Sequence, residues 1–135
     1  MTRSKTFSLP VRVYFQDTDA GGVVYHANYL NFMERARTEW LRAHGYSNAG
    51  LMKEFGMVFV VRSIKLDYLR PAMLDDALDV TAQIKDIGRS RISLAQSILR
   101  GTEALTEAEV HLVCVSVATF KPASVPEVLR AQLEK

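Results

Sequence analysis

The chain has 135 residues, a formal net charge of +2, a hydrophobic share of 48% and a charged share of 24%. This composition is ordinary for a globular protein and excludes a disordered or fibrous chain, and the length fits one domain over residues 1–135. The small positive charge is spread over both halves, which argues against nucleic acid as a partner, although local basic clusters could meet a phosphate-bearing ligand.

The N-terminal segment Met1–Pro10 carries Arg3 and Lys5, but neither an apolar signal region nor a small-residue cleavage site follows it. No run in the chain approaches the ~18 apolar residues that a membrane span needs. We therefore expect a cytoplasmic protein with no integral membrane segment.

Leu9–Gln16 is rich in Val, Tyr and Phe, which predicts a first strand at or near a sheet edge. An Asp-Thr-Asp-Ala-Gly-Gly loop ends this strand. A long helix is predicted over Ala27–His44, because apolar residues recur there at steps of three and four, and Gly45 ends it. The apolar positions are Tyr29, Phe32, Met33, Ala36 and Trp40, and the polar faces carry Glu34, Arg35, Arg37, Thr38, Glu39 and Arg42.

Ser47 can cap a second, short helix that runs to about Lys53 and is broken by Gly56. From that point the pattern changes to strands. Met57–Tyr68 is long and rich in β-branched residues, and Leu78–Ile84 alternates apolar and polar residues, which predicts a sheet with one solvated face.

Gly88 turns the chain into a strand over Arg91–Leu99. The next strand, Leu105–Phe120, is apolar on both faces and is expected to be central in the sheet. It contains Cys114, the single cysteine, so one chain can form neither a disulfide nor a Cys-based metal site, and a reducing compartment fits best. Val125–Glu134 is expected to form a loose terminal helix.

The order β-α-β-β-β-β predicts an α+β protein in which an antiparallel sheet curls around one long helix, because the helix must bury its apolar side against a sheet face. So small a sheet leaves edges and an apolar face uncovered. We therefore expect a homo-oligomer.

Asp17 and Asp19 are the candidate reactive carboxylates of the loop. One of them could attack a carbonyl or deprotonate water while the other holds the loop by accepting backbone hydrogen bonds. Both could equally serve only as turn residues, and a Mg²⁺ site would want further carboxylates nearby. The spacing does not choose between them.

Gly21 and Gly22 allow close backbone approach to a ligand, and the helix that follows would direct free amides at the loop, as in an oxyanion hole. His26, at the helix start, could bind substrate, orient water or act as an acid, or could be a capping or surface histidine. Farther along, Arg89, Ser90 and Arg91 form a hairpin suited to phosphate contacts, or an ordinary exposed turn.

With these residues the chain resembles the hotdog-fold acyl-CoA thioesterases of the 4-hydroxybenzoyl-CoA thioesterase superfamily, most closely the Tol-Pal-associated YbgC-like group. The similarity covers nearly the whole chain, and its first motif is highly specific. The matching segments are Val11-Arg12-Val13-Tyr14, Asp17-Thr18-Asp19-Ala20-Gly21-Gly22-Val23-Val24-Tyr25-His26, Glu34-Arg35-Ala36-Arg37-Thr38-Glu39, Phe59-Val60-Val61-Arg62, Arg70-Pro71-Ala72, Leu74-Asp75-Asp76 and Glu107-Ala108-Glu109-Val110.

The resemblance implies a hotdog fold, in which a five-stranded antiparallel sheet wraps one long central helix. It also implies dimers that often pair into tetramers, with active sites between protomers. It ranks the acids, since the family's catalytic aspartate matches Asp19 and leaves Asp17 to support the loop. The backbone amide of His26 matches the group that polarises the thioester carbonyl, and the YbgC-like group also assigns a role to the His26 side chain.

Substrate contacts are expected at Tyr25, at Val58 and, for the CoA nucleotide, at the hairpin residues Arg89, Ser90 and Arg91. The resemblance implies acyl-CoA as the substrate, with no metal and no cofactor beyond the CoA that the substrate carries. One departure concerns the group's tyrosine beside the Asp-Thr-Asp motif, where this chain has Phe15, with Tyr14 one place earlier on the opposite strand face.

Two other functions are weighed against acyl-CoA hydrolysis. The first is a scaffold that docks on acyl carrier protein or lipid-synthesis enzymes, with incidental hydrolysis. The second is hotdog dehydratase chemistry, which would want an acid on the helix paired with a histidine, and for which only Glu34 competes.

Overall fold

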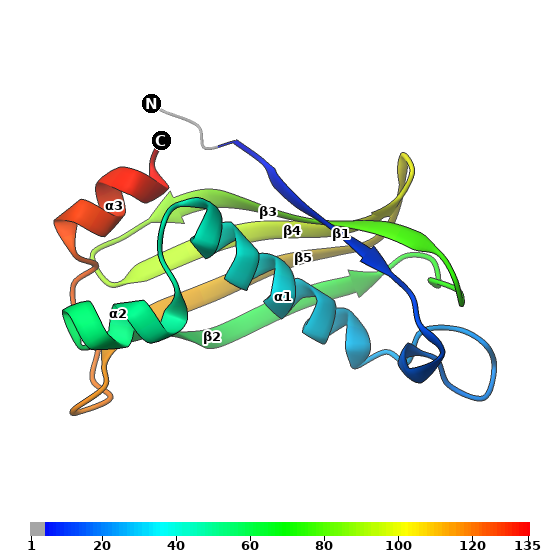
Figure 1. Ribbon diagram of the computed structural model, residues 1–135, viewed down its shortest axis with the longest axis horizontal. Helices are drawn as coiled ribbons and strands as arrows, with labels where there is room; N and C mark the ends of the chain where they lie inside the picture. The colour runs from blue at the N-terminus through cyan, green and yellow to red at the C-terminus, as the bar shows by residue number, and fades with distance from the viewer. Residues whose placement is uncertain (1–4) are drawn as a thin grey trace.

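The computed structural model describes residues 5–135, so Arg3 and part of the N-terminal segment discussed above lie outside the described residues. One curled sheet runs through the molecule, α1 lies across one of its faces, and α2 and α3 gather at one end (Figure 1). The elements are β1 (Phe7–Arg12), the 3-10 turn η1 (Phe15–Asp17), α1 (Asn28–Ala43), α2 (Asn48–Phe55), β2 (Met57–Tyr68), β3 (Ala77–Ile87), β4 (Arg91–Arg100), β5 (Glu103–Ser116) and α3 (Glu127–Leu133).

The sheet has five antiparallel strands in the order β1-β3-β4-β5-β2. This confirms the predicted element order and the edge position of the first strand. β2 is the other edge strand, and it pairs with β5 from Met57 opposite Ser116 to Tyr68 opposite Thr106. Within residues 5–135, no helix combines the length and the apolar character needed to cross a membrane.

The prediction that the last strand is central was wrong, because β4 occupies the middle and β5 lies beside the edge strand β2. The apolar pattern that suggested a central position has another cause. The segment after β5 folds back on it, with Val115 bridged to Pro122 and the Ala123 amide donating to the Cys114 carbonyl at 2.8 Å. The strand also ends at Ser116, before the predicted Phe120, because the chain turns there.

Helix α1 buries the apolar stripe predicted from its periodicity, and it packs on β1 and β3. Phe32, Met33 and Ala36 are almost wholly buried, and each large side chain of this kind contributes about 1.5–3 kcal/mol on burial. Gly45 takes a φ of 92° just beyond the end of the helix, which confirms it as the predicted stop.

Helix α2 begins and ends where its cap residues predict. The Ser47 Oγ accepts the Gly50 amide at 3.0 Å, and Gly56 adopts the left-handed conformation with a φ of 63°. β2 starts at the next residue, Met57. The terminal helix forms as α3, which buries Leu129 and Leu133.

The first strand is shorter than predicted, because the chain leaves the sheet before Gln16. β1 ends at Arg12, and Phe15–Asp17 forms η1. The Asp17 amide donates to the Tyr14 carbonyl at 2.9 Å, and this contact closes the turn. The turn carries the chain from the sheet edge into the loop that precedes α1.

Candidate active site

The carboxylate of Asp17 accepts a hydrogen bond within the loop. Its Oδ2 accepts the Tyr14 amide at 2.8 Å, and the residue is 7% exposed. Its backbone carbonyl accepts the Tyr25 amide at 2.9 Å and the Asn28 Nδ2 at 3.0 Å. Asp17 therefore ties the turn after β1 to the first residue of α1, which is a supporting role.

Asp19 is exposed and lies at a tight turn within the same loop. Its Oδ1 accepts the Gly21 amide at 2.8 Å, and its own amide donates to the Val23 carbonyl at 2.9 Å. Gly22 has a φ of 79°, a conformation that favours glycine, and a Cβ on Gly21 would stand 3.3 Å from the Asp19 Oδ1. The lack of a side chain at Gly21 leaves space beside the carboxylate, whose Oδ2 has no hydrogen-bond partner among the described residues.

The backbone carbonyl of His26 accepts a hydrogen bond, while its backbone amide is free. Its carbonyl accepts the Tyr68 hydroxyl at 2.7 Å. Among residues 5–135 no acceptor lies within hydrogen-bond range of its amide, which immediately precedes the N-terminal turn of α1. The N-cap residue, Ala27, offers no side-chain acceptor either. A free donor beside a helix N-terminus can bind an oxyanion.

Tyr68 is a residue that the sequence did not single out. It stands at the end of β2, far along the chain, and packs edge-on against Tyr29 with ring centroids 5.2 Å apart. Burial, and to a smaller extent Tyr29, raises the pKa of Tyr68 above its ordinary value, so its hydroxyl keeps the proton that it donates to His26. Only the folded chain brings Tyr68 to the loop.

A cavity of ≈ 280 Å³ opens at this place, and its lining includes His26, Tyr68 and Leu69. The ring centroids of His26 and Tyr25 are 4.4 Å apart, and Tyr25 is 47% exposed. The predicted residues Asp19, Tyr25 and His26 share the segment that leads into α1, and the Thr18–Val24 bridge closes the part that holds Asp19. Of the three, His26 lines the cavity.

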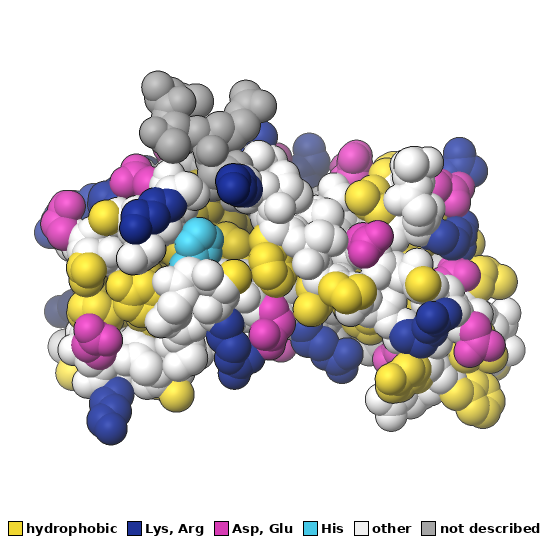
Figure 2. Space-filling model, turned by 45° about the horizontal axis from the view of Figure 1, so that its top comes forward, with side chains coloured by type: hydrophobic (Ala, Val, Ile, Leu, Met, Phe, Trp, Pro, Cys, Tyr) yellow, Lys and Arg dark blue, Asp and Glu magenta, His cyan; other side chains and the backbone are white. Residues whose placement is uncertain are grey.

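Phe15 and Tyr14 lie at the turn η1 and not in a strand, so the strand alternation that placed them on opposite faces does not apply. Both are exposed, Phe15 at 81% and Tyr14 at 61%. Apolar side chains reach the surface at this end of the molecule, on the right of Figure 2, among interspersed charges of both signs.

Val58 and the hairpin Arg89–Arg91 lie at the other end of the sheet (Figure 1). Val58 is ten positions before Tyr68 in β2, so the two Cα atoms are roughly 33 Å apart along an extended strand. The hairpin is docked against the C-terminal segment, where the Arg89 Nε donates to the Ser124 Oγ at 2.9 Å and Arg130 donates to the Gly88 carbonyl at 2.7 Å. One copy of the chain does not bring these residues to Asp19.

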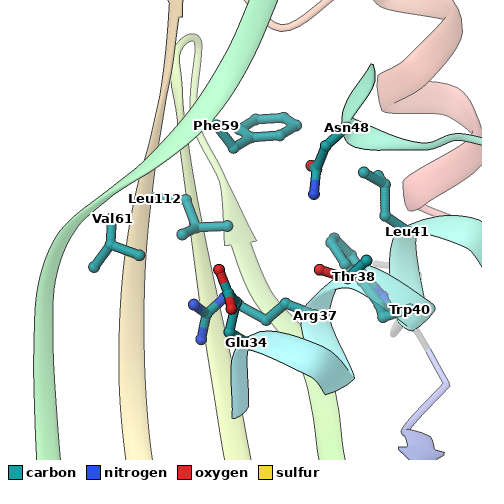
Figure 3. Close-up of a pocket in the computed structure, with 9 residues that line it drawn as sticks. All are labelled: Glu34, Arg37, Thr38, Trp40, Leu41, Asn48, Phe59, Val61 and Leu112. Atoms are coloured by element: carbon teal, nitrogen blue, oxygen red, sulfur yellow. The ribbon is translucent and has the colours of Figure 1, made fainter. Parts of the chain in front are cut away.

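A second cavity, of ≈ 120 Å³, lies between α1 and β2, and in Figure 3 the Glu34 and Arg37 side chains lie next to each other within it. Arg37 belongs to the polar residues of the predicted helix, but it is half-buried and not on a solvated face. Its Nη1 donates to the Oε1 of Gln96 at 2.9 Å, and burial lowers its pKa while Glu34 opposes the change. Gln96 is 1% exposed, so Arg37 belongs to a polar network under the helix.

The family model of the thioesterase-like superfamily matches residues 13–133. The acyl-CoA thioesterase YbgC of Haemophilus influenzae is 44% identical over 125 residues, covering 93% of this chain and 92% of that protein. The acyl-CoA thioester hydrolase YbgC of Escherichia coli O6:H1 is 45% identical over 130 residues, covering 96% of each.

Solved structures agree with this similarity. A probable thioesterase from Bartonella henselae superposes with a TM-score of 0.86 at 36% identity, covering 90% of this chain and 100% of that chain. A 1,4-dihydroxy-2-naphthoyl-CoA thioesterase from Synechocystis gives a TM-score of 0.87 at 25% identity, with 96% of each chain covered. The family match and these likenesses confirm the predicted hotdog fold and the family resemblance. A family model that spans 13–133 and relatives of this identity show that the chain belongs to the thioesterase-like superfamily.

Proposed function

We propose that the protein hydrolyses acyl-CoA thioesters to a free acid and CoA. The observation that carries the proposal is that one loop holds the exposed Asp19 carboxylate and, seven positions later, the free amide of His26 at the start of α1. Curated relatives that are 44–45% identical carry acyl-CoA thioesterase or thioester hydrolase names, which supports the same reaction.

In this mechanism the His26 amide donates to the thioester carbonyl oxygen as negative charge develops on it. Asp19 either attacks the carbonyl carbon, forming an anhydride that water then hydrolyses, or takes a proton from the water that attacks. In both routes the C–S bond breaks and the CoA thiolate leaves with the electron pair. A thiolate is a good leaving group, so one carboxylate and one amide donor can suffice.

The test is release of free thiol from a panel of short, long and aromatic acyl-CoAs by the purified protein. Turnover of at least one acyl class is expected. Absence of thiol release from every member of the panel would contradict the proposal.

The site needs a second copy if the Arg89–Arg91 hairpin is to hold the CoA phosphates. Within one chain, the length of β2, roughly 33 Å between the Cα atoms of Val58 and Tyr68, separates the hairpin from the Asp19 loop. In a homodimer formed by antiparallel pairing of two β2 edges, the hairpin of one copy lies near the Asp19 loop of the other. We further propose that two such dimers form a homotetramer. β2 has one free edge, and Val61 on it is 46% exposed. Sedimentation analysis of the purified protein measures this oligomeric state.

Hydrolysis is proposed to need no metal and no cofactor, because the carboxylate and the amide donor supply the required chemistry. Incubation with EDTA followed by gel filtration is therefore expected to leave kcat and KM unchanged. Loss of activity that added Mg²⁺ or Zn²⁺ restores would contradict this expectation.

Acyl carrier protein is proposed as a second source of acyl groups, since it presents the same phosphopantetheine thioester as CoA. Comparison of kcat/KM for one acyl group on the two carriers tests this. A carrier protein that the wild type binds but does not hydrolyse, with an affinity that Asp19→Asn leaves unchanged, would favour the scaffold role. The proposed compartment is the cytoplasm, because the single cysteine, Cys114, is free and one chain can form no disulfide.

Tyr68→Phe tests how far the His26 backbone depends on β2. The change removes the hydroxyl that donates to the His26 carbonyl at 2.7 Å and leaves the ring against Tyr29. We expect a loss of about 1 kcal/mol in unfolding free energy and a several-fold lower kcat, measured by denaturant unfolding and thiol release. An unchanged kcat would show that this contact does not position the amide.

A further inference from the structure

The turn between β5 and α3, residues 116–121, presents a strained aromatic residue to solvent. Phe120 has a φ of 58° and is 71% exposed. A bulky side chain in the left-handed region costs of order 1–3 kcal/mol, and such strain persists only where the surroundings enforce it. Exposure of a large apolar ring adds a second unfavourable feature at the same residue.

Hydrogen bonds hold this turn in one conformation. The Ser116 amide donates to the Lys121 carbonyl at 2.9 Å, and the Phe120 amide donates to the Ser116 carbonyl at 2.7 Å. The Thr119 Oγ1 accepts the Lys121 amide at 3.2 Å. The Phe120 backbone is therefore fixed in place, and little conformational entropy would be lost on contact with a partner.

The turn is attached to the start of β2, because the Val117 amide donates to the Gly56 carbonyl at 3.0 Å. The cavity at His26 is attached to the other end of the same strand through Tyr68. The 12 residues of β2 separate the two by roughly 35–40 Å. Phe120 therefore lies far from the cavity of its own chain.

Two copies remove this separation if their β2 strands pair antiparallel about a two-fold axis, as in the proposed dimer. With the two-fold axis at the midpoint of the strand, each Met57 lies opposite the partner's Tyr68, and the turn of one copy meets the His26 cavity of the other. Figure 1 shows that the turn after β5 and the loop before α1 both extend past the β2 edge, at opposite ends of the strand.

The cavity offers an apolar surface for a ring. Leu69 is 51% exposed and Tyr68 is 50% exposed, and both line it together with Pro71. We infer that Phe120 of one copy lies over the open side of the partner's cavity lined by His26, Tyr68 and Leu69, where it positions the acyl thioester. This rests on the proposed function and on the proposed dimer.

The first experiment tests the contact without using activity. Phe120→Cys and Leu69→Cys are introduced together, and the protein is mildly oxidised and examined on a nonreducing gel. A disulfide within one chain is prevented by the length of β2, so a covalent dimer is expected, while Phe120→Cys alone gives none. Absence of the covalent dimer from the double variant, in protein that sediments as a dimer, would overturn the inference.

The second experiment measures the effect on hydrolysis. Phe120→Gly removes the ring and relieves the strained φ, so its folding is not at risk. We expect KM to rise on the order of tenfold, the equivalent of burying one apolar side chain, with little change in melting temperature. Val128→Ala, on α3 and 54% exposed in the wild type, is the matched control and should leave KM unchanged. An unchanged KM in Phe120→Gly would overturn the inference.

Mixed dimers then show which chain supplies the ring. A dimer of Asp19→Asn with Phe120→Gly contains one intact site, so it should have the wild-type KM and about half the wild-type kcat. A dimer of wild type with a chain carrying both substitutions contains no intact site and should keep the raised KM. The reverse pattern would mean that Phe120 acts within its own chain. If wild type hydrolyses no acyl-CoA, the proposed function fails, and the cross-linking result still decides the contact.

Discussion

Asp19→Asn is expected to lower kcat for acyl-CoA hydrolysis by on the order of 10²–10⁴-fold, the usual contribution of a base in the transition state. An amide can neither attack the thioester carbonyl nor take a proton from water. Asn preserves the local structure, because its Oδ1 can still accept the Gly21 amide that the Asp19 Oδ1 accepts at 2.8 Å. The loss should therefore appear in kcat while the fold is unchanged.

The measurement is thiol release under saturating acyl-CoA, together with the melting temperature of each variant. Asp79→Asn is the matched control, since Asp79 is an exposed carboxylate in β3 outside the loop, and its kcat should equal that of wild type. Equal kcat values for Asp19→Asn and wild type would remove Asp19 from the mechanism and, with it, the proposed role of the loop.

Asp17→Ala is expected to lower both stability and activity, although Asp17 faces the loop and not the substrate. Asp17 is 7% exposed, and the change removes the carboxylate to which the Tyr14 amide donates, which costs about 1–3 kcal/mol of unfolding free energy. The loop that carries Asp19 and His26 then shifts. A displacement of about 1 Å can lower kcat on the order of a hundredfold.

The conservative variants separate the two acids. Asp17→Asn retains an oxygen that can accept the Tyr14 amide, so it should recover most of the stability and most of the kcat lost in Asp17→Ala. Asp19→Asn recovers no activity. Denaturant unfolding and thiol release on the same preparations measure both quantities, and a dead but fully stable Asp17→Asn would assign the chemistry to Asp17.

Much of the fold could be predicted because its signals are local. The 3.6-residue periodicity places α1, the serine before Asn48 and the glycine after Phe55 bound α2, and β-branched residues mark β2 to within its observed ends. The end of β1 could not be predicted in this way. Tyr14 and Phe15 favour a strand by composition, and only the Asp17 carboxylate bonded to the Tyr14 amide turns the chain out of the sheet.

The candidate site likewise has a part that local sequence predicts and a part that it does not. Local sequence places Asp17, Asp19, Gly22 and His26 in one loop before a helix, since their chemistry and spacing are local properties of the chain. It left the two acids unranked until the family resemblance separated them, and the hydrogen bonds of Asp17 now give a physical reason for its supporting role.

Only the tertiary structure decided which distant residues meet. Strand pairing brings Tyr68 to the His26 carbonyl, the packing of α1 on the sheet brings Arg37 to Gln96, and the length of β2 keeps the Arg89–Arg91 hairpin away from Asp19 within one copy. These contacts depend on register and packing between segments that are far apart along the chain. Local residue pattern carries no information on such distances, because it describes only neighbours in sequence.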